Sequence, residues 1–178
     1  MWPVAEASAA LLYGLPPIAG PDTRLLILGS FPGAASLQAG QYYAHPRNQF
    51  WPILAQLWPQ DAQPQDYAGR CDWLLAHGLG VWDVYASCER AGSLDSAIRN
   101  ASLNDFAALQ QRCPLLQAAA HNGGESFRHA KKVQAALGLP VYRLPSTSPA
   151  NASWSAERKL AGWREVLPGP THPGHYLI

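Results

Sequence analysis

Short apolar segments alternate along the chain with longer segments in which apolar residues recur at helical spacing. The short segments are bounded by turn-forming residues and cover residues 24–29, 80–84, 114–120 and 140–144. The first is an almost continuous run of leucine and isoleucine, as expected of a strand that helices cover on both faces. Helical spacing occurs at residues 48–58, 66–77, 104–112, 126–137 and 153–167. This alternation predicts an α/β fold, a three-layer α/β/α sandwich around a short, mainly parallel four-stranded sheet.

The length of the chain predicts one domain. A chain of 178 residues buries about 70% of its unfolded surface, which is sufficient for one hydrophobic core. Residues 1–23 and 168–178 are rich in proline and glycine, so we expect them to be tails that wrap the rest. The prediction is a single domain spanning residues 1–178, with its core at about residues 24–166.

Composition excludes several classes of protein. Hydrophobic residues make up 48% of the chain and charged residues only 14%, a balance typical of packed globular proteins and not of disordered ones. No apolar run approaches ~18 residues, and no basic segment leads into an apolar one near the start, so neither membrane insertion nor secretion is predicted. We therefore expect a cytoplasmic protein.

Cysteine and histidine spacing gives no sign of a metal site or a disulfide framework. The three cysteines, Cys71, Cys88 and Cys113, are scattered and form no CxxC pair, which predicts reduced structural thiols. His172 and His175 lack further ligands at suitable spacing, and their proline- and glycine-rich segment is a poor rigid support. We expect no metal and no cofactor.

The net charge of +1 does not by itself indicate a nucleic-acid-binding protein, but the charges are unevenly distributed. Residues 1–120 carry six lysines and arginines against nine acidic residues, a balance of −3, whereas residues 121–178 carry seven against three, a balance of +4. Either the seven basic residues of the second part gather on one face or they are scattered solvated charges. They are Arg128, Lys131, Lys132, Arg143, Arg158, Lys159 and Arg164.

Unusual residues follow each predicted strand, at the sheet edge where ligands bind in folds of this kind. In chain order the loops hold a glycine-bounded turn, an aromatic-rich stretch, an aspartate, an Asn-Gly-Gly segment and a Ser/Thr/Pro-rich segment, at residues 29–33, 42–51, 83, 122–124 and 145–151. Aromatic and amide groups beside a loop of small polar residues suit the extrusion of a base from DNA, because the ring stacks on the base while polar groups read its edge. The same spacing also fits a core aromatic cluster, so the pattern alone leaves both interpretations open.

Two other chemistries fit these loops less well. Ser30 stands at the wrong position for the GxSxG elbow of a serine hydrolase. Gly123 and Gly124 lack the Lys-Ser/Thr that follows in a nucleotide-binding loop, although amides at a helix start are suited to hold a phosphate of DNA.

Three stretches resemble motifs of the uracil-DNA glycosylase superfamily. Its first motif, a GxNPG-like turn and an aromatic-A-H-P-x-N-x-F-W stretch, is similar to Gly29-Ser30-Phe31-Pro32-Gly33 and Tyr43-Ala44-His45-Pro46-Arg47-Asn48-Gln49-Phe50-Trp51. Its base-reading strand end and second motif resemble Trp82-Asp83-Val84 and Ser146-Thr147-Ser148-Pro149-Ala150-Asn151. The resemblance spans about residues 24–166 and is strongest to the hypoxanthine (deoxyinosine) DNA glycosylase branch.

The resemblance implies roles for particular residues. Asn48 matches the catalytic asparagine of this branch, Tyr43 the aromatic that stacks on the flipped base, and Asp83 the residue that reads the edge of that base. Phe31 and Ser146 stand where better-known branches carry an Asp or Asn that handles water and a catalytic His or Asn. Phe31 then only lines the base pocket, and Ser146 is a weaker, uncharged catalytic donor.

The remaining assignments concern contacts with DNA. We expect DNA to be held by Arg47, Gly123, Ser148 and Asn151. Asn122 fits either a base contact or a turn residue. Structural roles also remain open for two central residues, because Asp83 fits a loop cap and Asn48 fits the N-cap of the helix that it begins.

These expectations combine into one predicted function and two alternatives. The motifs hold no lysine that could form a Schiff base, so we expect a monofunctional, monomeric DNA glycosylase that hydrolyses the N-glycosidic bond of a deaminated base. Hypoxanthine is the first expected base and uracil the second, in double-stranded DNA, with single-stranded DNA as a further substrate. The alternatives are a mismatch-specific uracil or thymine glycosylase, and a catalytically silent nucleic-acid-binding domain.

Overall fold

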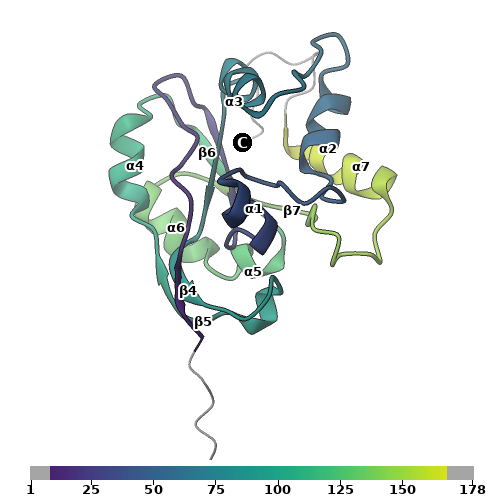
Figure 1. The fold of residues 1–178 in the computed structure, drawn as a ribbon. Helices are drawn as coiled ribbons and strands as arrows, with labels where there is room; N and C mark the ends of the chain where they lie inside the picture. Colours follow the sequence, from purple (N-terminus) through teal and green to yellow (C-terminus); the bar gives the residue numbers. More distant parts are fainter. Residues whose placement is uncertain (1–8, 168–178) are drawn as a thin grey trace, which may run out of the picture.

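A computed structural model describes residues 9–167, with a four-stranded parallel sheet at the centre (Figure 1). The strands are β2 (Leu25–Gly29), β3 (Leu79–Asp83), β6 (Ala118–Asn122) and β7 (Val141–Leu144). They pair in the order β3-β2-β6-β7, and each neighbouring pair is parallel. The predicted sheet is confirmed, although β6 begins at Ala118 and not at residue 114.

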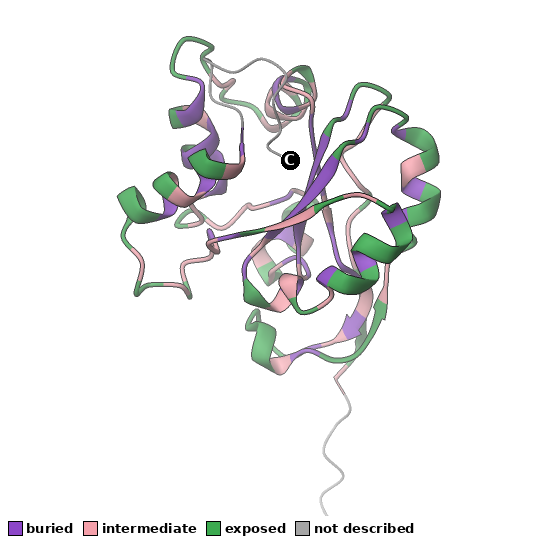
Figure 2. Cartoon of the chain, turned by 180° about the vertical axis from the view of Figure 1, so that it is seen from behind, coloured by how far each residue is buried: buried purple, intermediate pink, exposed green. Residues whose placement is uncertain are grey.

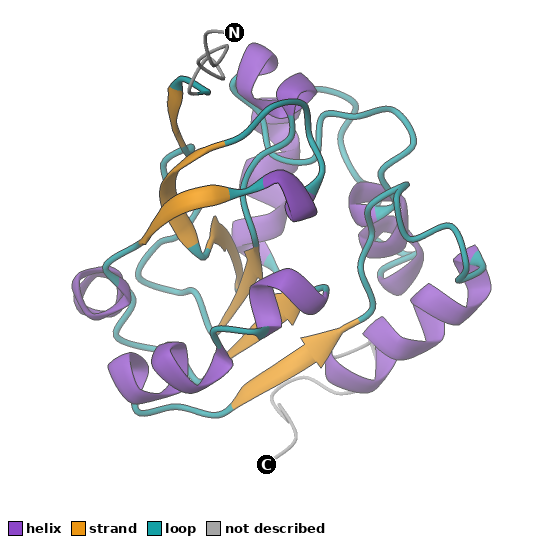
Figure 3. Cartoon of the chain, turned by 90° about the horizontal axis from the view of Figure 1, so that it is seen from below, coloured by secondary structure: helices purple, strands orange, loops and turns teal. Residues whose placement is uncertain are grey.

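Helices cover both faces of this sheet and complete a three-layer sandwich, with the buried strands between more exposed helices (Figures 2 and 3). Residues of β2 alternate between the faces, since Leu25 and Ile27 belong to one hydrophobic cluster, and Leu26 and Leu28 to the other. The first cluster includes side chains from α2 (Phe50–Leu57), α3 (Tyr67–Ala76) and α7 (Ala156–Val166). The second includes side chains from α4 (Phe106–Arg112) and α6 (Ala130–Leu137).

Side-chain caps determine where three of these helices begin. In each case an oxygen of the residue before the helix accepts a hydrogen bond from a backbone N–H in the first turn, which would otherwise lack a partner. The pairs are Asp66 with Gly69, Asp105 with Ala108 and Ser155 with Arg158.

The predicted helix at 126–137 is in fact two helices, α5 (Gly124–Phe127) and α6. The hydroxyl of Ser126 donates to the carbonyl of Leu28 at 2.9 Å and lies 2.7 Å from Nδ1 of His121. These bonds attach the short helix to the end of the sheet, and α6 then begins after His129 in a separate turn.

The structure also contains a second, antiparallel sheet that the sequence pattern did not predict. It consists of β1 (Leu11–Tyr13), β4 (Tyr85–Glu89) and β5 (Arg99–Leu103), in the order β1-β4-β5. Strand β5 is exposed over most of its length and has no apolar face, so backbone pairing with β4 is what defines it. Two short helical segments, α1 (Ala34–Ala39) and η1 (Asp95–Ala97), were likewise not predicted.

The first expected tail contains a short strand. Residues 1–23 were predicted to wrap the rest of the chain, and β1 lies within them and pairs with β4. The second expected tail, 168–178, lies outside the described residues, and so do His172 and His175. No helix of residues 9–167 is long and apolar enough to cross a membrane.

The strand order determines where the loops meet. From β2 the chain passes to β3 on one side and then returns to β6 on the other, so β2 and β6 flank a switch point. Ligand sites of open parallel sheets form at such a point, beyond the carboxyl ends of the strands. Gly29, Asp83, Asn122 and Leu144 end the four strands there.

Candidate active site

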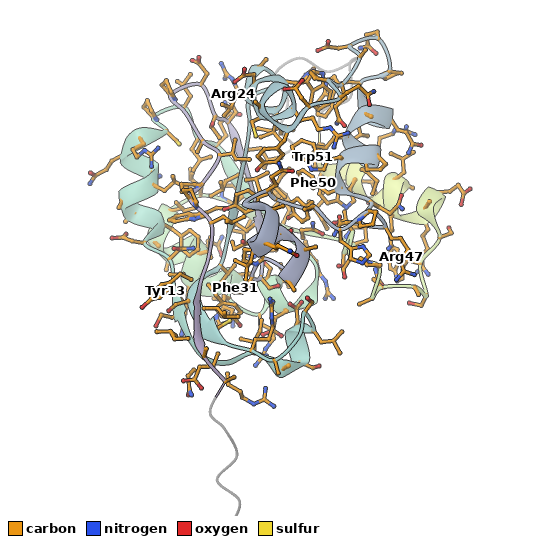
Figure 4. The ribbon with its side chains drawn as sticks, in the orientation of Figure 1. Tyr13, Arg24, Phe31, Arg47, Phe50 and Trp51 are labelled. Atoms are coloured by element: carbon orange, nitrogen blue, oxygen red, sulfur yellow. The ribbon has the colours of Figure 1, made fainter. Side chains whose placement is uncertain are left out.

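A cavity of about 830 Å³ opens at this edge of the sheet and brings together most of the residues that the sequence singled out. Its walls come from the loops after β2, β6 and β7, from Asp83 at the end of β3, and from residues 93–96 at the start of η1. Nine of the ten predicted site residues line it: Phe31, Tyr43, Asn48, Asp83, Asn122, Gly123, Ser146, Ser148 and Asn151. The tenth, Arg47, is exposed on the loop between Tyr43 and α2 and lies at the periphery of the molecule in Figure 4.

Asp83 is a buried carboxyl group in the cavity wall. The residue is 5% exposed, and its Oδ2 has no hydrogen-bond partner among the described residues. Burial, together with the nearby charge of Asp95, raises the pKa of Asp83 from 3.8 to about 7, and Arg90 opposes this rise only in part. The side chain therefore exchanges its proton near neutral pH. If Asp83 capped a loop, its carboxylate oxygens would accept hydrogen bonds from that loop. The unpaired Oδ2 therefore disfavours the interpretation of Asp83 as a loop cap.

Gly29 leaves the space that Asp83 occupies. A Cβ at position 29 would lie 2.5 Å from Oδ1 of Asp83 and 3.2 Å from the hydroxyl oxygen of Tyr43. Any larger residue at the end of β2 would thus displace both side chains. The glycine of the first motif is required here by close packing.

Tyr43 is held in an unusual backbone conformation with its ring against the core. Its φ of +55° lies in the left-handed region, which a tyrosine rarely adopts. The ring stacks on Phe50 with centroids 4.0 Å apart and an interplanar angle of 20°. The aromatic position is therefore fixed from one side by α2 and lines the cavity.

Asn122 connects Tyr43 to the loop after β7. Its Nδ2 donates to the hydroxyl oxygen of Tyr43 at 3.2 Å and to Oγ1 of Thr147 at 2.9 Å, while its Oδ1 accepts from the backbone N–H of Thr147 at 3.0 Å. All three bonds are internal to the protein. These bonds position Tyr43 and the loop after β7, so the geometry favours a structural role for Asn122 over a base contact.

Asn48 lies in the cavity wall just before α2. The N-cap position belongs to Gln49, one residue later than the sequence suggested, and no side-chain bond caps the helix there. Oδ1 of Asn48 nevertheless accepts from the backbone N–H of Phe50 at 2.9 Å, which fixes the orientation of the amide. Its Nδ2 has no recorded partner in residues 9–167 and is available to the cavity.

The loop after β7 is braced by its own polar groups. Oγ of Ser146 accepts from the backbone N–H of Ser148 at 3.2 Å, and Nδ2 of Asn151 donates to the carbonyl of Ser146 at 3.2 Å. The ammonium group of Lys159 on α7 donates to the carbonyl of Ser148 at 3.3 Å. The small polar residues are thereby held in one arrangement along the cavity.

The seven basic residues of the second part of the chain do not all lie on the surface. Lys159 is 4% exposed, and burial lowers its pKa. Arg128 pairs with Glu125 at 3.1 Å, whereas Arg143 lines the cavity and lies over the ring of Phe127. The idea that all seven basic residues form one face is therefore wrong for Lys159.

Phe31 and Arg90 form the buried base of the first-motif turn. Phe31 packs in the second hydrophobic cluster, and the guanidinium of Arg90 lies 5.2 Å from the centre of its ring. Nη2 of Arg90 donates to the carbonyl of Pro32 at 2.6 Å. Sequence reasoning missed Arg90, because an arginine just after an unpredicted strand gives no sign of burial.

The segment before η1 forms a part of the cavity rim that sequence reasoning also missed. Oγ of Ser93 accepts from the backbone N–H of Ala34 at 2.8 Å, and Oδ1 of Asp95 accepts from the hydroxyl of Ser30 at 2.7 Å. Leu94 stands between them at the cavity. No motif marks these residues, and they belong to the excursion through the antiparallel sheet.

Gly123 yields a prediction about stability. Its φ of +100° with ψ of 172° is a conformation that only glycine adopts readily, and a Cβ there would lie 3.0 Å from Cβ of Ser146. We expect Gly123→Ala to lower the free energy of unfolding by about 1–3 kcal/mol, measured by urea denaturation. Gly124→Ala is the matched control, because its Cβ would meet only the flexible end of Arg143 at 3.2 Å. Equal losses in both variants would contradict this assignment.

Comparison with known proteins places this arrangement in a family. Residues 16–167 match the profile of the Uracil DNA glycosylase superfamily. The chain is 36% identical over 154 residues to a hypoxanthine DNA glycosylase of Methanosarcina barkeri and 32% identical over 154 residues to one of Methanosarcina acetivorans, in each case covering 86% of this chain and 96% of the relative.

A solved structure supports the same family assignment. The solution NMR structure of a Methanosarcina acetivorans protein described as a uracil DNA glycosylase superposes with a TM-score of 0.77 at 31% identity, covering 89% of this chain and 97% of that one. The profile match covers most of the chain, and the relatives align over nearly their full length. The chain therefore belongs to the uracil DNA glycosylase superfamily.

Proposed function

We propose that this chain excises hypoxanthine from DNA by hydrolysing its N-glycosidic bond. The chain is a DNA N-glycosylase of base excision repair, as its superfamily and its relatives named hypoxanthine DNA glycosylase establish. The observation that carries the choice of base is the buried carboxyl of Asp83, whose Oδ2 is unpaired among the described residues.

Asp83 distinguishes the deaminated bases from the normal ones. Hypoxanthine and uracil present a carbonyl beside a ring N–H, whereas adenine and cytosine present a bare ring nitrogen at the equivalent place. An ionised Asp83 accepts a hydrogen bond from the ring N–H, and its lone pairs repel the bare nitrogen. Mismatches of this polar kind discriminate by ~10⁴. Guanine carries the same N–H, so its exocyclic amine is excluded by the shape of the cavity.

Tyr43 supplies the stacking surface. One face of its ring is covered by Phe50, and its hydroxyl is held by Asn122. A flipped base that stacks on the cavity side completes an aromatic layer without moving Tyr43. Since the ring is already fixed, little conformational entropy is lost when the base enters.

Asn48 and Ser146 supply polar groups near the sugar. Bond cleavage passes through an oxocarbenium-like state, so orienting the water and stabilising charge matter more than a strong nucleophile. The amide of Asn48 holds a water molecule, whose oxygen bonds to C1′ as the C1′–N9 bond breaks. The base leaves with the electron pair of that bond and takes up one proton, and the water loses one proton as it becomes the hydroxyl on C1′. Phe31 has no polar group for this task.

The product is an intact strand with an abasic site. No lysine is among the described residues that line the cavity, and Lys159 is directed to the carbonyl of Ser148. A Schiff base with the sugar, and the strand cleavage that follows it, is therefore not part of the proposal.

The remaining contacts are proposed for the DNA backbone. Arg47 is exposed beside the cavity loop and suits a phosphate, while Gly123, Ser148 and Asn151 offer amide and hydroxyl groups at the rim. We propose double-stranded DNA as the main substrate and single-stranded DNA as a further one. We further propose that the protein acts as a single-domain monomer in the cytoplasm, where its three free cysteines stay reduced.

Single-turnover cleavage of labelled duplexes tests this function. Three duplexes carry one inosine, one uracil opposite guanine, or one thymine opposite guanine, and alkali reveals the abasic sites. Rapid cleavage of the inosine duplex is the expected result. If only the duplex with mismatched uracil or thymine is cleaved, the substrate is that mismatched base and not hypoxanthine. Tight binding of inosine DNA by folded protein without any abasic product would favour a silent DNA-binding domain.

A further inference from the structure

Leu94 is a large apolar side chain that the protein leaves in solvent at the mouth of the cavity. It is 60% exposed, and it lines the cavity together with its neighbours in the segment 93–96. Three other large apolar side chains of the described residues are similarly exposed, and none of those lines the cavity: Leu11, Tyr13 and Leu115. Leu94 is thus distinguished from the other exposed apolar side chains of residues 9–167 by its place at the cavity, where a bound substrate can cover it.

The residues on both sides of Leu94 are tied to the first-motif turn. Ser93 accepts from the backbone N–H of Ala34, and Asp95 accepts from the hydroxyl of Ser30. Just upstream, the buried guanidinium of Arg90 binds the carbonyl of Pro32. Leu94 therefore lies in a segment that is hydrogen-bonded on both sides of it to the first-motif turn, and the same turn lines the cavity.

Elsewhere in the cavity lining of residues 9–167, no large apolar side chain is comparably exposed. The loop after β7 contributes Ser148, Pro149, Ala150 and Asn151, all small or polar. Trp154 also lines the cavity, but the guanidinium of Arg158 lies 3.7 Å from the centre of its ring. Within residues 9–167, Leu94 is thus the exposed large apolar side chain of the cavity rim.

We propose that Leu94 enters the base stack at the position that the extruded nucleotide leaves and holds that nucleotide in the cavity. This inference rests on the proposed function, because extrusion is what creates the gap. An apolar side chain inserted between base steps replaces part of the lost stacking and blocks the return of the base. The occupant of the Leu94 surface is accordingly a DNA duplex opened at one nucleotide.

The test compares Leu94→Ala with Leu115→Ala. Leu115 is 42% exposed and lies outside the cavity lining, between α4 and β6, so it controls for the loss of a surface leucine. We expect Leu94→Ala to slow single-turnover cleavage of a duplex with inosine opposite cytosine by about 10-fold or more. Cleavage of the same strand without its complement should change by less than about twofold, because no stack has to be opened.

Two results would overturn the inference. One is a duplex rate for Leu94→Ala equal to that of Leu115→Ala. The other is an equal loss on the single strand, which would make Leu94 a wall of the base pocket. Both surface variants retain every hydrogen bond recorded around the cavity, so a folding defect is not expected to confuse the comparison.

A fluorescence readout separates this inference from the proposed chemistry. The fluorescent base 2-aminopurine, placed next to the inosine in the duplex, brightens when its neighbour leaves the stack. Wild-type protein should raise the signal and Leu94→Ala should not. A rise without cleavage that is lost in Leu94→Ala would refute the proposed excision and retain Leu94 as the inserting residue. Cleavage with the same signal in both proteins, or no rise with either, would refute the role of Leu94.

Discussion

Replacing Asn48 with alanine is expected to lower the single-turnover rate on an inosine duplex by about 100-fold or more and to leave duplex affinity nearly unchanged. The reason is that the amide acts on the water and the sugar as charge develops, and not on the ground-state complex. Its Oδ1 is oriented by the backbone N–H of Phe50, and its Nδ2 is available to the cavity. An oriented amide of this kind needs no reorganisation during the reaction.

The measurement pairs cleavage with equilibrium binding of the same duplex. Gln49→Ala is the control, since this neighbouring amide lies outside the cavity lining and its Nε2 donates to the carbonyl of Arg47 at 3.5 Å. Asn48→Ala also loses the bond to Phe50, which should cost about 1 kcal/mol of stability and leave the protein folded. An unchanged rate would remove Asn48 from the mechanism, and a parallel loss of rate and affinity would assign it to binding.

Asp83→Asn is expected to have two large and opposite effects. Cleavage of the inosine duplex should fall by about 100-fold or more, because an amide that presents its N–H cannot accept the ring N–H of the base. At the same time the free energy of unfolding at pH 8 should rise, because the variant no longer buries an ionisable carboxyl group. Both results are expected if the ionised Asp83 lowers the free energy of unfolding and is also necessary for activity.

The pH dependence follows from the direction of the pKa shift. The pKa of Asp83 is raised from 3.8 to about 7 in the folded protein, so its contribution to stability is present in full below about pH 4. That contribution is lost as the pH rises from there to about 7. The loss amounts to something on the order of 4 kcal/mol at pH 8. Asp83→Asn should therefore exceed the wild type in stability at pH 8 and approach it at pH 5, as measured by urea denaturation.

Activity should change with pH in the opposite sense. If the ionised carboxylate accepts the ring N–H, the wild-type rate rises as the pH increases through about 7, and the Asp83→Asn rate stays low and flat. A wild-type rate that falls over this range would mean that protonated Asp83 donates to the carbonyl of the base. The stability difference between Asp83→Asn and wild type should be larger at pH 8 than at pH 5. An equal difference at both pH values would contradict the burial of a charged group.

The order of apolar residues predicted those parts of the fold that bury their side chains in a regular way. The run from Leu25 to Leu28 is apolar at every position because both of its faces are buried, whereas the helical segments of the two outer layers bury one face each. Strand β5 was not found, since it is almost fully exposed and is held by backbone bonds to β4. Backbone pairing alone does not produce a pattern of apolar residues in the sequence.

The candidate site was predictable where the residues follow a strand of the parallel sheet. Parallel strands end at one edge, so Asp83, Asn122 and the loop after β7 had to meet. The rim around Leu94 and the buried Arg90 could not be predicted in this way, because they reach the cavity through the antiparallel sheet. The hydrogen bonds of Asn122 to Tyr43 and Thr147 likewise depend on tertiary contacts that spacing does not encode.

The most direct measurement is the identification of both products from an inosine duplex. Wild-type protein and Asn48→Ala are incubated with the duplex, free base is quantified by mass spectrometry, abasic sites are counted, and strand breaks are measured before and after alkali. We predict that the wild type releases one hypoxanthine for each abasic site, with the strand intact until alkali is added, and that Asn48→Ala releases about 100-fold less in the same time. Strand breaks without alkali, or abasic sites without free hypoxanthine, would contradict monofunctional hydrolysis of the N-glycosidic bond.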